Sequence, residues 1–500
     1  MMPALLRGRG ACLALVAAVS FLVHAKGLSA PLLDYHFHRQ VNTASIARNY
    51  WRQALPIAQP RIDWAGPEDR LAGTELPAYM WLYGKLWPVF GLGELWGRLI
   101  SVAASALTAL LLFGLYEREF GREAALWGAV TFSFLPVEIY FGRTVQPEAT
   151  ALLALVSALI LWEKALDPGR PWLAWTLAVF CAFIATGLKL PYAHMLAALA
   201  GLTWRRLGRR AWTDWRTALA GALAMGGVIA WYLRARQGVY VVPTHGDEYV
   251  KLLSYARLPY FMQFQIFSRF PELVTTYGGA VLFALGAREV LGRRRDAFWI
   301  AWFGGVALHL FAMAGYSHYH EYTALPMAPV VAGLIGVAAA GLRARIGLLA
   351  PGRRAWAQAA FLLLIASIPA HAALRIHHWY RQGFTYLASA RAAAAAVSSP
   401  SDLFLTNCQA SSVLLYYLDR RGWSDELDIH PEDAPRILDE AAARGARFIA
   451  SEKRGLFAAP DGSLWRRFRA QGPPLWDDGA LVIFPLGGPS ALNGRIGPRP

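Results

Sequence analysis

Long apolar stretches alternate with short polar connections along most of the chain. Each holds about twenty residues, the length that lets a helix cross the roughly 30 Å hydrocarbon core of a bilayer. The pattern predicts about eleven membrane-spanning helices, at residues 11–30, 95–116, 124–141, 147–166, 172–189, 190–204, 217–236, 272–289, 297–316, 322–342 and 355–374. We therefore expect a polytopic α-helical membrane protein whose spans form a bundle within residues 1–374.

The arginines between these stretches follow a regular alternation. Every second connection is basic, beginning with Arg7 and Arg9 before the first stretch, and such an excess marks the cytoplasmic side. The other connections are expected outside the cytoplasm, including a first loop at 31–94, whose amphipathic helices lie at the interface, and a long loop at 237–271. A cleaved signal peptide is the alternative for the first stretch, and it would leave the later topology unchanged.

The apolar pattern changes after the last predicted span. Short β-rich segments alternate there with helical ones, so residues 375–500 are predicted to form a small extracytoplasmic α/β domain. The predicted strands cover 402–405, 447–450 and 480–484, and the predicted helices lie near 410–418 and 433–444. Gly445 follows the second helix directly, a position typical of a helix C-terminus.

Composition supports the membrane assignment. Hydrophobic residues make up 56% of the chain and charged residues only 16%, whereas soluble proteins carry about a quarter charged residues. The net charge of +16 does not indicate nucleic-acid binding, because the arginines sit in short clusters between apolar stretches. The three cysteines are scattered, which argues against a disulfide framework or a cysteine metal site.

The segment 33–51, after the first stretch, is rich in chemically active side chains. If the segment is extended, Asp34, His36 and His38 share one face; if it is helical, Asp34 and His38 align four residues apart. From about residue 41 the apolar positions recur with helical spacing. This spacing predicts a helix that lies half-buried in the membrane interface.

Further ionisable residues lie at the extracytoplasmic ends of the spans. They are Arg143, Glu148, Lys189, His194, His318, His320 and Glu321. Charged groups at membrane depth are costly and so mark functional sites. Because these residues end different spans on one side, we expect them to converge on one cavity. The alternative is that Lys189 and Arg143 extend toward lipid headgroups, while the histidines are satisfied within the bundle.

Several short motifs occur one after another along the chain. Asp34 comes directly after the first span, GTELP covers 73–77, Arg143 is followed by QPE, Lys189 ends an LK pair, HEYTALP covers 320–326 and YYLDRRGW covers 416–423. In this order they resemble the GT-C superfamily of polyprenyl-phosphate-sugar-dependent glycosyltransferases. The resemblance covers nearly the whole chain, and it is strongest to the bacterial protein-mannosyltransferase-like and aminoarabinose-transferase-like branch.

The resemblance implies a glycosyltransferase of the bacterial inner membrane, with its active face and C-terminal domain periplasmic. It implies inverting transfer of a hexosyl or pentosyl group from a polyprenyl phosphate to a glycan, lipid or protein acceptor. Asp34 is then expected to act as catalytic base, while Lys189 and Arg143 bind the donor phosphate. The substrate-binding candidates are His36, His38, Arg39, Asp63, Glu75, Glu148, His320, Glu321 and Tyr322.

Several alternatives stay open for these residues. Asp34 could instead pair with Arg39 or Arg48 and anchor the loop, and Asp63 could belong to a solvated turn. A divalent metal ion is left open, because the segment around Asp34 offers oxygen and nitrogen ligands, but no ligands are assigned. The loop at 237–271 is too long for a simple connector, and we expect it to act as a lid or to guide the lipid.

Two other functions would use a similar lipid-linked sugar. A transporter or flippase would need polar residues through the membrane midplane and often carries internal repeats; the sequence shows neither clearly. A polysaccharide ligase or polymerase would share the donor chemistry but transfer an oligosaccharide.

Overall fold

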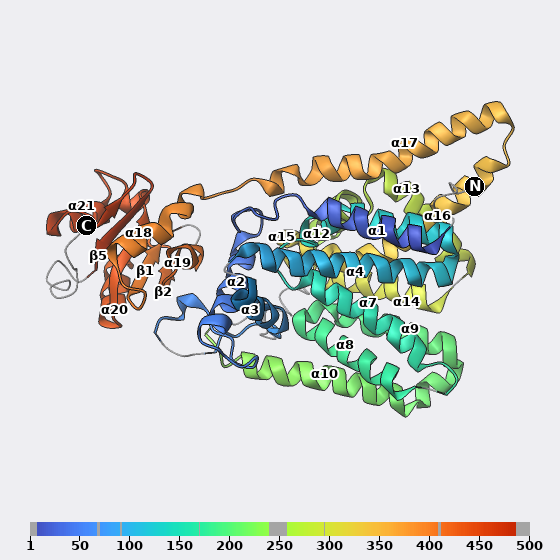
Figure 1. The fold of residues 1–500 in the computed structure, drawn as a ribbon, viewed down its shortest axis with the longest axis horizontal. Helices are drawn as coiled ribbons and strands as arrows, with labels where there is room; N and C mark the ends of the chain where they lie inside the picture. The colour runs from blue at the N-terminus through green and yellow to red at the C-terminus, as the bar shows by residue number, and fades with distance from the viewer. Residues whose placement is uncertain are drawn as a thin grey trace.

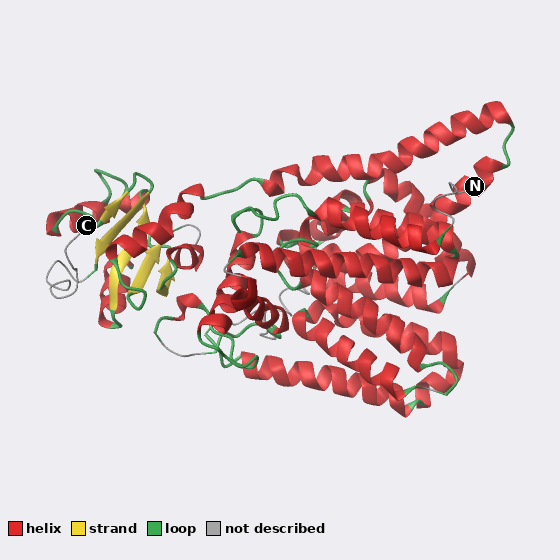
Figure 2. Cartoon of the chain, in the orientation of Figure 1, coloured by secondary structure: helices red, strands yellow, loops and turns green. Residues whose placement is uncertain are grey.

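The computed structural model describes residues 8–67, 71–90, 93–169, 171–239, 258–294, 296–408 and 412–486. Helices dominate, and they form a bundle from which a small sheet-containing unit projects at one end (Figures 1 and 2). Within the described part, four helices are long and apolar enough to cross a membrane, or five if one sharply bent pair counts as a single span. The chain is thus a multi-pass membrane protein, and the count of about eleven spans stays a prediction.

The first half of the bundle is built around the long helix α4. Its helices are α1 (Arg9–His24), α2 (Phe37–Arg52), η2 (Asp63–Ala65), α3 (Ala78–Phe90), α4 (Glu94–Phe120), α5 (Arg122–Phe134), α6 (Pro136–Phe141), α7 (Glu148–Ala165), α8 (Trp172–Leu188), η3 (Leu190–His194), α9 (Met195–Leu207), η4 (Gly208–Thr213) and α10 (Trp215–Ala235). The predicted span 124–141 is broken at Leu135, because the following Pro136 disfavours helical geometry in the residue before it.

The second half closes the bundle and leads to the sheet. Its helices are α12 (Pro259–Phe264), η5 (Gln265–Thr275), α13 (Tyr277–Ala287), η6 (Arg288–Arg294), α14 (Ala297–Ala312), α15 (Ala314–Tyr319), η7 (Glu321–Met327), α16 (Ala328–Gly347), α17 (Pro351–Ile376) and η8 (His377–Tyr380). Helix α12 and η5 lie at the end of the predicted loop 237–271, which is therefore partly helical. Residues 240–257, where most of the expected lid falls, lie outside the described residues.

The C-terminal unit contains a five-stranded sheet in the order β2-β1-β3-β5-β4. Its strands are β1 (Leu403–Asn407), β2 (Arg421–Asp425), β3 (Ala446–Glu452), β4 (Trp476–Asp477) and β5 (Leu481–Pro485). Its helices are η9 (Thr385–Ser389), α18 (Ala390–Val397), α19 (Ser412–Leu418), α20 (Ala434–Ala443), η10 (Gly455–Phe457) and α21 (Ser463–Gln471). Strands β1, β2 and β3 are parallel, and β5 runs antiparallel to β3. The three predicted strands are present, while β2, β4 and α21 were not predicted.

The prediction for the first loop is partly wrong, and the difference concerns helix α2. The predicted helix is present, but it is not half-buried in an interface, since every residue from Gln40 to Tyr50 except Asn42 is buried. It packs between α3 and α19, at the end of the bundle that faces the sheet (Figure 1). Protein, rather than lipid, therefore covers the polar side of this helix.

Candidate active site

Asp34 lies in a fully buried cluster of hydrogen-bonding groups just before α2. Its Oδ2 atom accepts hydrogen bonds from Arg143 Nη2 at 2.5 Å and from Arg98 Nη1 at 3.3 Å. Its Oδ1 atom accepts a hydrogen bond from Gln40 Nε2 at 2.6 Å. The carboxylate is 1% exposed and both arginines are 0% exposed. Asp34 is therefore ion-paired, as the alternative interpretation expected. Its partners are Arg143 and Arg98, and not Arg39 or Arg48.

The backbone at His36 decides where these side chains point. His36 adopts a left-handed conformation with φ of 59°, and α2 begins only at Phe37. The segment before α2 is thus neither extended nor helical, so both predicted alignments of Asp34 with His38 are wrong. Asp34 points to Arg143, whereas His36 Nε2 lies 2.9 Å from Glu321 Oε2. His38 stacks beside Phe37, with ring centroids 4.2 Å apart.

A second buried cluster surrounds Lys189 at the end of α8. Its Nζ atom lies 2.7 Å from Glu148 Oε1 and 3.3 Å from Glu75 Oε1. Arg39 Nη2 donates to the same oxygen of Glu75 at 2.8 Å. Two acidic and two basic side chains therefore form one network: Glu75, Glu148, Arg39 and Lys189. They come from α2, the GTELP motif, α7 and the end of α8.

Glu75, which lies outside the predicted spans, is held in its charged form. Burial alone would raise the pKa of this carboxyl group, but Arg39, Lys189 and a hydrogen bond from Thr74 outweigh burial and lower the pKa to about 2. At neutral pH Glu75 is therefore a carboxylate, and it lies in a largely buried cluster, where electrostatic interactions are strong.

Tyr322 connects the Lys189 cluster to His36. Its ring centroid lies 5.3 Å from Lys189 Nζ and 5.3 Å from the ring of His36. The ring of His320 stacks against it at the same distance of 5.3 Å, and Tyr316 shares a hydrogen bond with its hydroxyl at 2.7 Å. Candidates from the first loop, α8 and η7 thus meet around one aromatic ring.

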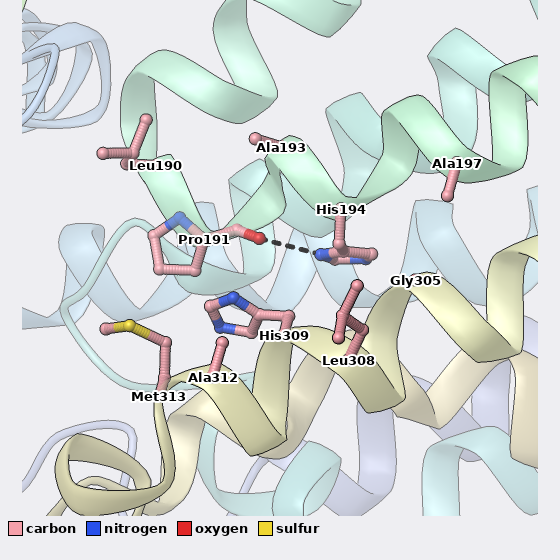
Figure 3. A pocket seen from close by; sticks show the side chains of 10 residues that line it. All are labelled: Leu190, Pro191, Ala193, His194, Ala197, Gly305, Leu308, His309, Ala312 and Met313. Atoms are coloured by element: carbon pink, nitrogen blue, oxygen red, sulfur yellow. Dashed lines mark hydrogen bonds between the residues drawn. The ribbon is translucent and has the colours of Figure 1, made fainter. Parts of the chain in front are cut away.

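Asp63, His194 and His318 lie elsewhere, and the ring of His318 packs against Phe264 of α12. Asp63 binds Arg48 Nη2 at 2.5 Å and Asn49 Nδ2 at 2.9 Å, so it is a buried partner within the loop rather than part of a solvated turn. His194 faces His309 across an apolar pocket of about 350 Å³ between η3 and α14 (Figure 3). It therefore does not join the other candidates.

Among the residues of these clusters, Arg98, Gln40 and Arg269 were missed as site residues by the sequence analysis. Arg98 lies inside a predicted span, and a charged group there is a signal of function that could have been used. Gln40 is uncharged and gives no such signal. Arg269, on η5, binds Glu321 Oε1 at 3.0 Å, but the π-helical turn that buries its side chain has no simple sequence pattern.

Among the residues that the structure describes, no three His, Cys, Asp or Glu side chains lie close enough together to hold a metal ion. His36 instead contacts Glu321, and His38 and His320 make ring contacts.

Known proteins are similar to this chain in part of its sequence and in its overall arrangement. Residues 74–232 match the family model of dolichyl-phosphate-mannose-protein mannosyltransferases. The whole chain superposes on the crystal structure of ArnT from Cupriavidus metallidurans bound to undecaprenyl phosphate, with a TM-score of 0.60 and 15% identity, covering 98% of this chain and 100% of that one. The chain has the GT-C fold. The fold expected from the motifs is thereby confirmed.

Two further solved structures with the GT-C fold are similar over much of the chain, and one relative is similar in sequence over a shorter stretch. AglB, the oligosaccharyltransferase of Archaeoglobus fulgidus, was solved with an inhibitory peptide and a dolichol-phosphate; its TM-score is 0.62 at 12% identity, covering 88% of this chain and 69% of that one. The mycobacterial arabinofuranosyltransferase AftD has a TM-score of 0.56 at 13% identity, covering 95% and 41%. An uncharacterized protein of Aquifex aeolicus is 32% identical over 130 residues, which are 26% of this chain and 29% of that protein.

Proposed function

We propose that this chain is an integral-membrane glycosyltransferase of the bacterial inner membrane. It takes a hexosyl or pentosyl group from a polyprenyl-phosphate donor and passes it to a hydroxyl of a glycan, glycolipid or protein outside the cytoplasm. The GT-C fold supports this proposal, because two structures that share it hold a polyprenyl phosphate, ArnT an undecaprenyl phosphate and AglB a dolichol-phosphate.

The observation that carries the proposal is the buried pairing of Asp34 with Arg143 at the ends of two separate elements. The Asp34 carboxyl group accepts three hydrogen bonds, and its oxygens are of the kind that accept a proton in general-base catalysis. A guanidinium group also binds phosphate strongly. A donor phosphate would therefore compete with Asp34 for Arg143, and the competition would free a lone pair of Asp34 for the acceptor proton.

The reaction that follows is one direct displacement. The acceptor oxygen forms a bond to C1 of the sugar, the bond from C1 to the phosphate oxygen breaks, and the polyprenyl phosphate leaves. The acceptor proton passes to Asp34. Arg143 and Lys189 stabilise the negative charge on the departing phosphate, and attack from the side opposite to the phosphate inverts the configuration at C1.

Asp34→Asn tests the base directly, since it keeps the shape of the side chain and removes its charge. We expect donor-lipid binding to persist while turnover falls about 10²- to 10⁴-fold, the usual contribution of a general base. Removing one partner of a buried ion pair also lowers stability, so thermal unfolding must be measured alongside. Turnover at the wild-type rate by folded Asp34→Asn would refute the proposal.

A matched control separates lost catalysis from lost folding. Asp63 is likewise buried, with 3% exposure against 1% for Asp34, and it too pairs with a buried arginine of the same region. Asp63→Asn is expected to lower stability to a similar extent, but turnover per folded molecule is expected to stay near the wild-type value. An equal loss of turnover in both variants would count against a special role for Asp34.

A further inference from the structure

A basic pocket lies at the end of the bundle opposite to the candidate active site. It has a volume of about 480 Å³ and opens between η6, α13 and α16. Its lining includes Leu285, Arg288, Arg293, Val337, Leu342 and Arg345. The full lining combines three arginines and one glutamate with mostly apolar residues, and this combination fits a ligand that has an anionic group joined to hydrocarbon.

The position of this basic pocket along α4 places it at a membrane surface. Phe120, the last residue of α4, also lines the pocket, while Arg98 near the start of α4 binds Asp34. Phe120 is 22 positions after Arg98, which corresponds to about 33 Å of helix, close to the thickness of the hydrocarbon core. The pocket therefore lies at headgroup depth on the opposite face, which the arginine alternation assigns to the cytoplasm.

The arginines of the pocket have fewer acidic partners than the arginines near it. Neighbouring arginines have acidic partners, as Arg343 does in Glu123 at 3.0 Å and Arg122 in Glu117 at 2.7 Å. In the pocket, Glu289 pairs with Arg293 at 3.4 Å.

Two other arginines of the pocket differ from the paired arginines. For Arg288 and Arg345, no acidic partner is found among the residues that the structure describes, and both side chains are exposed. Three arginines and one glutamate give the pocket a net charge of +2, which an anionic headgroup would complement.

We infer that the basic pocket binds an anionic glycerophospholipid of the cytoplasmic leaflet. Arg288 and Arg345 contact the phosphate, and Leu285, Val337 and Leu342 contact the start of the acyl chains. Basic pockets between transmembrane helices on the cytoplasmic side are a recurrent form of lipid recognition. This site is separate from the proposed donor site, because it lies at the other membrane surface and shares no residue with it.

Native mass spectrometry of the full-length chain tests this inference. The detergent-purified protein is titrated with phosphatidylglycerol, with phosphatidylcholine and with inorganic phosphate. We expect phosphatidylglycerol to be retained most strongly and inorganic phosphate not to displace it. Equal retention of phosphatidylcholine would overturn the inference, and so would displacement of phosphatidylglycerol by inorganic phosphate, which would indicate a site for the free ion.

Paired variants locate the binding. Arg288→Gln combined with Arg345→Gln is expected to weaken phosphatidylglycerol retention about thirtyfold. The control combines Arg209→Gln with Arg353→Gln, two exposed arginines of the same charge alternation that do not line the pocket. It is expected to retain the lipid as the wild type does, with both proteins showing unchanged thermal unfolding. An equal loss in the control would assign the binding to overall charge and overturn the inference.

Discussion

Arg48 Nη1 lies 2.8 Å from Asp419 Oδ1 and so joins α2 to the C-terminal unit. The same guanidinium binds Asp63 and stacks over the ring of Tyr416 at 4.4 Å. Arg52, one turn further along α2, binds both oxygens of Asp419. The C-terminal unit is therefore fixed to the helix that follows Asp34, so its contacts bear on the geometry of the candidate active site.

Asp419→Asn is expected to lower the free energy of unfolding by about 1–3 kcal/mol. Breaking a buried ion pair costs more, but Asp419 is partly exposed and Arg48 keeps its contact with Asp63. Asparagine is the appropriate replacement because Asp419 has φ of 59°, a conformation that asparagine tolerates. Thermal unfolding and the rate of proteolysis near α2 measure the effect.

Asp433→Asn is the control for that substitution. Asp433 pairs with Arg436 on the surface, with side-chain exposures of 45% and 59%, and such pairs contribute little to stability. It is expected to change the unfolding free energy by less than about 0.5 kcal/mol. If both variants behave alike, the contact between α2 and Asp419 does not stabilise the docked unit.

The parts of the fold that the sequence predicted are those encoded by local pattern. Long apolar stretches identified where helices form but not where they break, since the predicted span 272–289 is divided by a 97° bend between η5 and α13. Alternating short segments identified β1, β3 and β5. Strand β2 was missed because RGWSD at 421–425 contains few residues that favour strands. It forms because β1 offers a parallel edge. Strand β4 has only two residues, too few for any periodicity.

The candidate site was predicted as a set of residues but not as a set of contacts. Asp34 and Arg143 were each singled out, yet they are separated by 109 positions, and nothing local indicates that they pair. The left-handed backbone at His36 was also not predicted, because a histidine in that conformation is uncommon. The packing around Tyr322, rather than any sequence motif, determines which charged side chains come into contact there.

The pH dependence of stability should reveal the charged state of Glu75. Its pKa is about 2 in the folded protein and 4.5 ordinarily, so between these values the unfolded state binds more protons. The stabilisation that Glu75 provides is therefore present above about pH 4.5 and is lost as the pH falls toward about 2. Thermal unfolding of the wild type and Glu75→Gln across this window measures the difference, which should shrink on acidification.

The control for the pH series is Glu432→Gln, whose side chain is 72% exposed. Its difference from the wild type should stay small at every pH in the window. A difference for Glu75→Gln that stays constant or grows as the pH falls would contradict the ion-paired state of Glu75.

Gly142 makes room for the turn that presents Arg143. A Cβ atom at this position would collide with His24 Nε2 and the carbonyl oxygen of Glu138. Gly142→Ala is therefore expected to destabilise the protein by about 1–3 kcal/mol, as overpacking does. Gly114→Ala is the control, since a Cβ atom there meets nothing within 4 Å and alanine favours the helix. Equal thermal stability of the two variants would show that the turn can relax.

Lys189 offers a test that separates phosphate binding from structural ion pairing. Lys189→Met leaves Glu148 without its cation and Glu75 with Arg39 alone. A buried charge without a partner is costly, typically about 3–5 kcal/mol. This single variant is expected to be strongly destabilised, so its low turnover alone would not reveal the role of the lysine.

The double variant Lys189→Met with Glu148→Gln removes both members of the ion pair. Replacing a whole buried pair is often close to neutral, so most of the lost thermal stability should return. If Lys189 binds the donor phosphate, turnover should stay low and donor binding weak despite the recovered fold, because the cation is still missing. Recovery of turnover together with stability would mean that Lys189 only neutralises Glu148, and the phosphate would then have to bind to Arg143 without it.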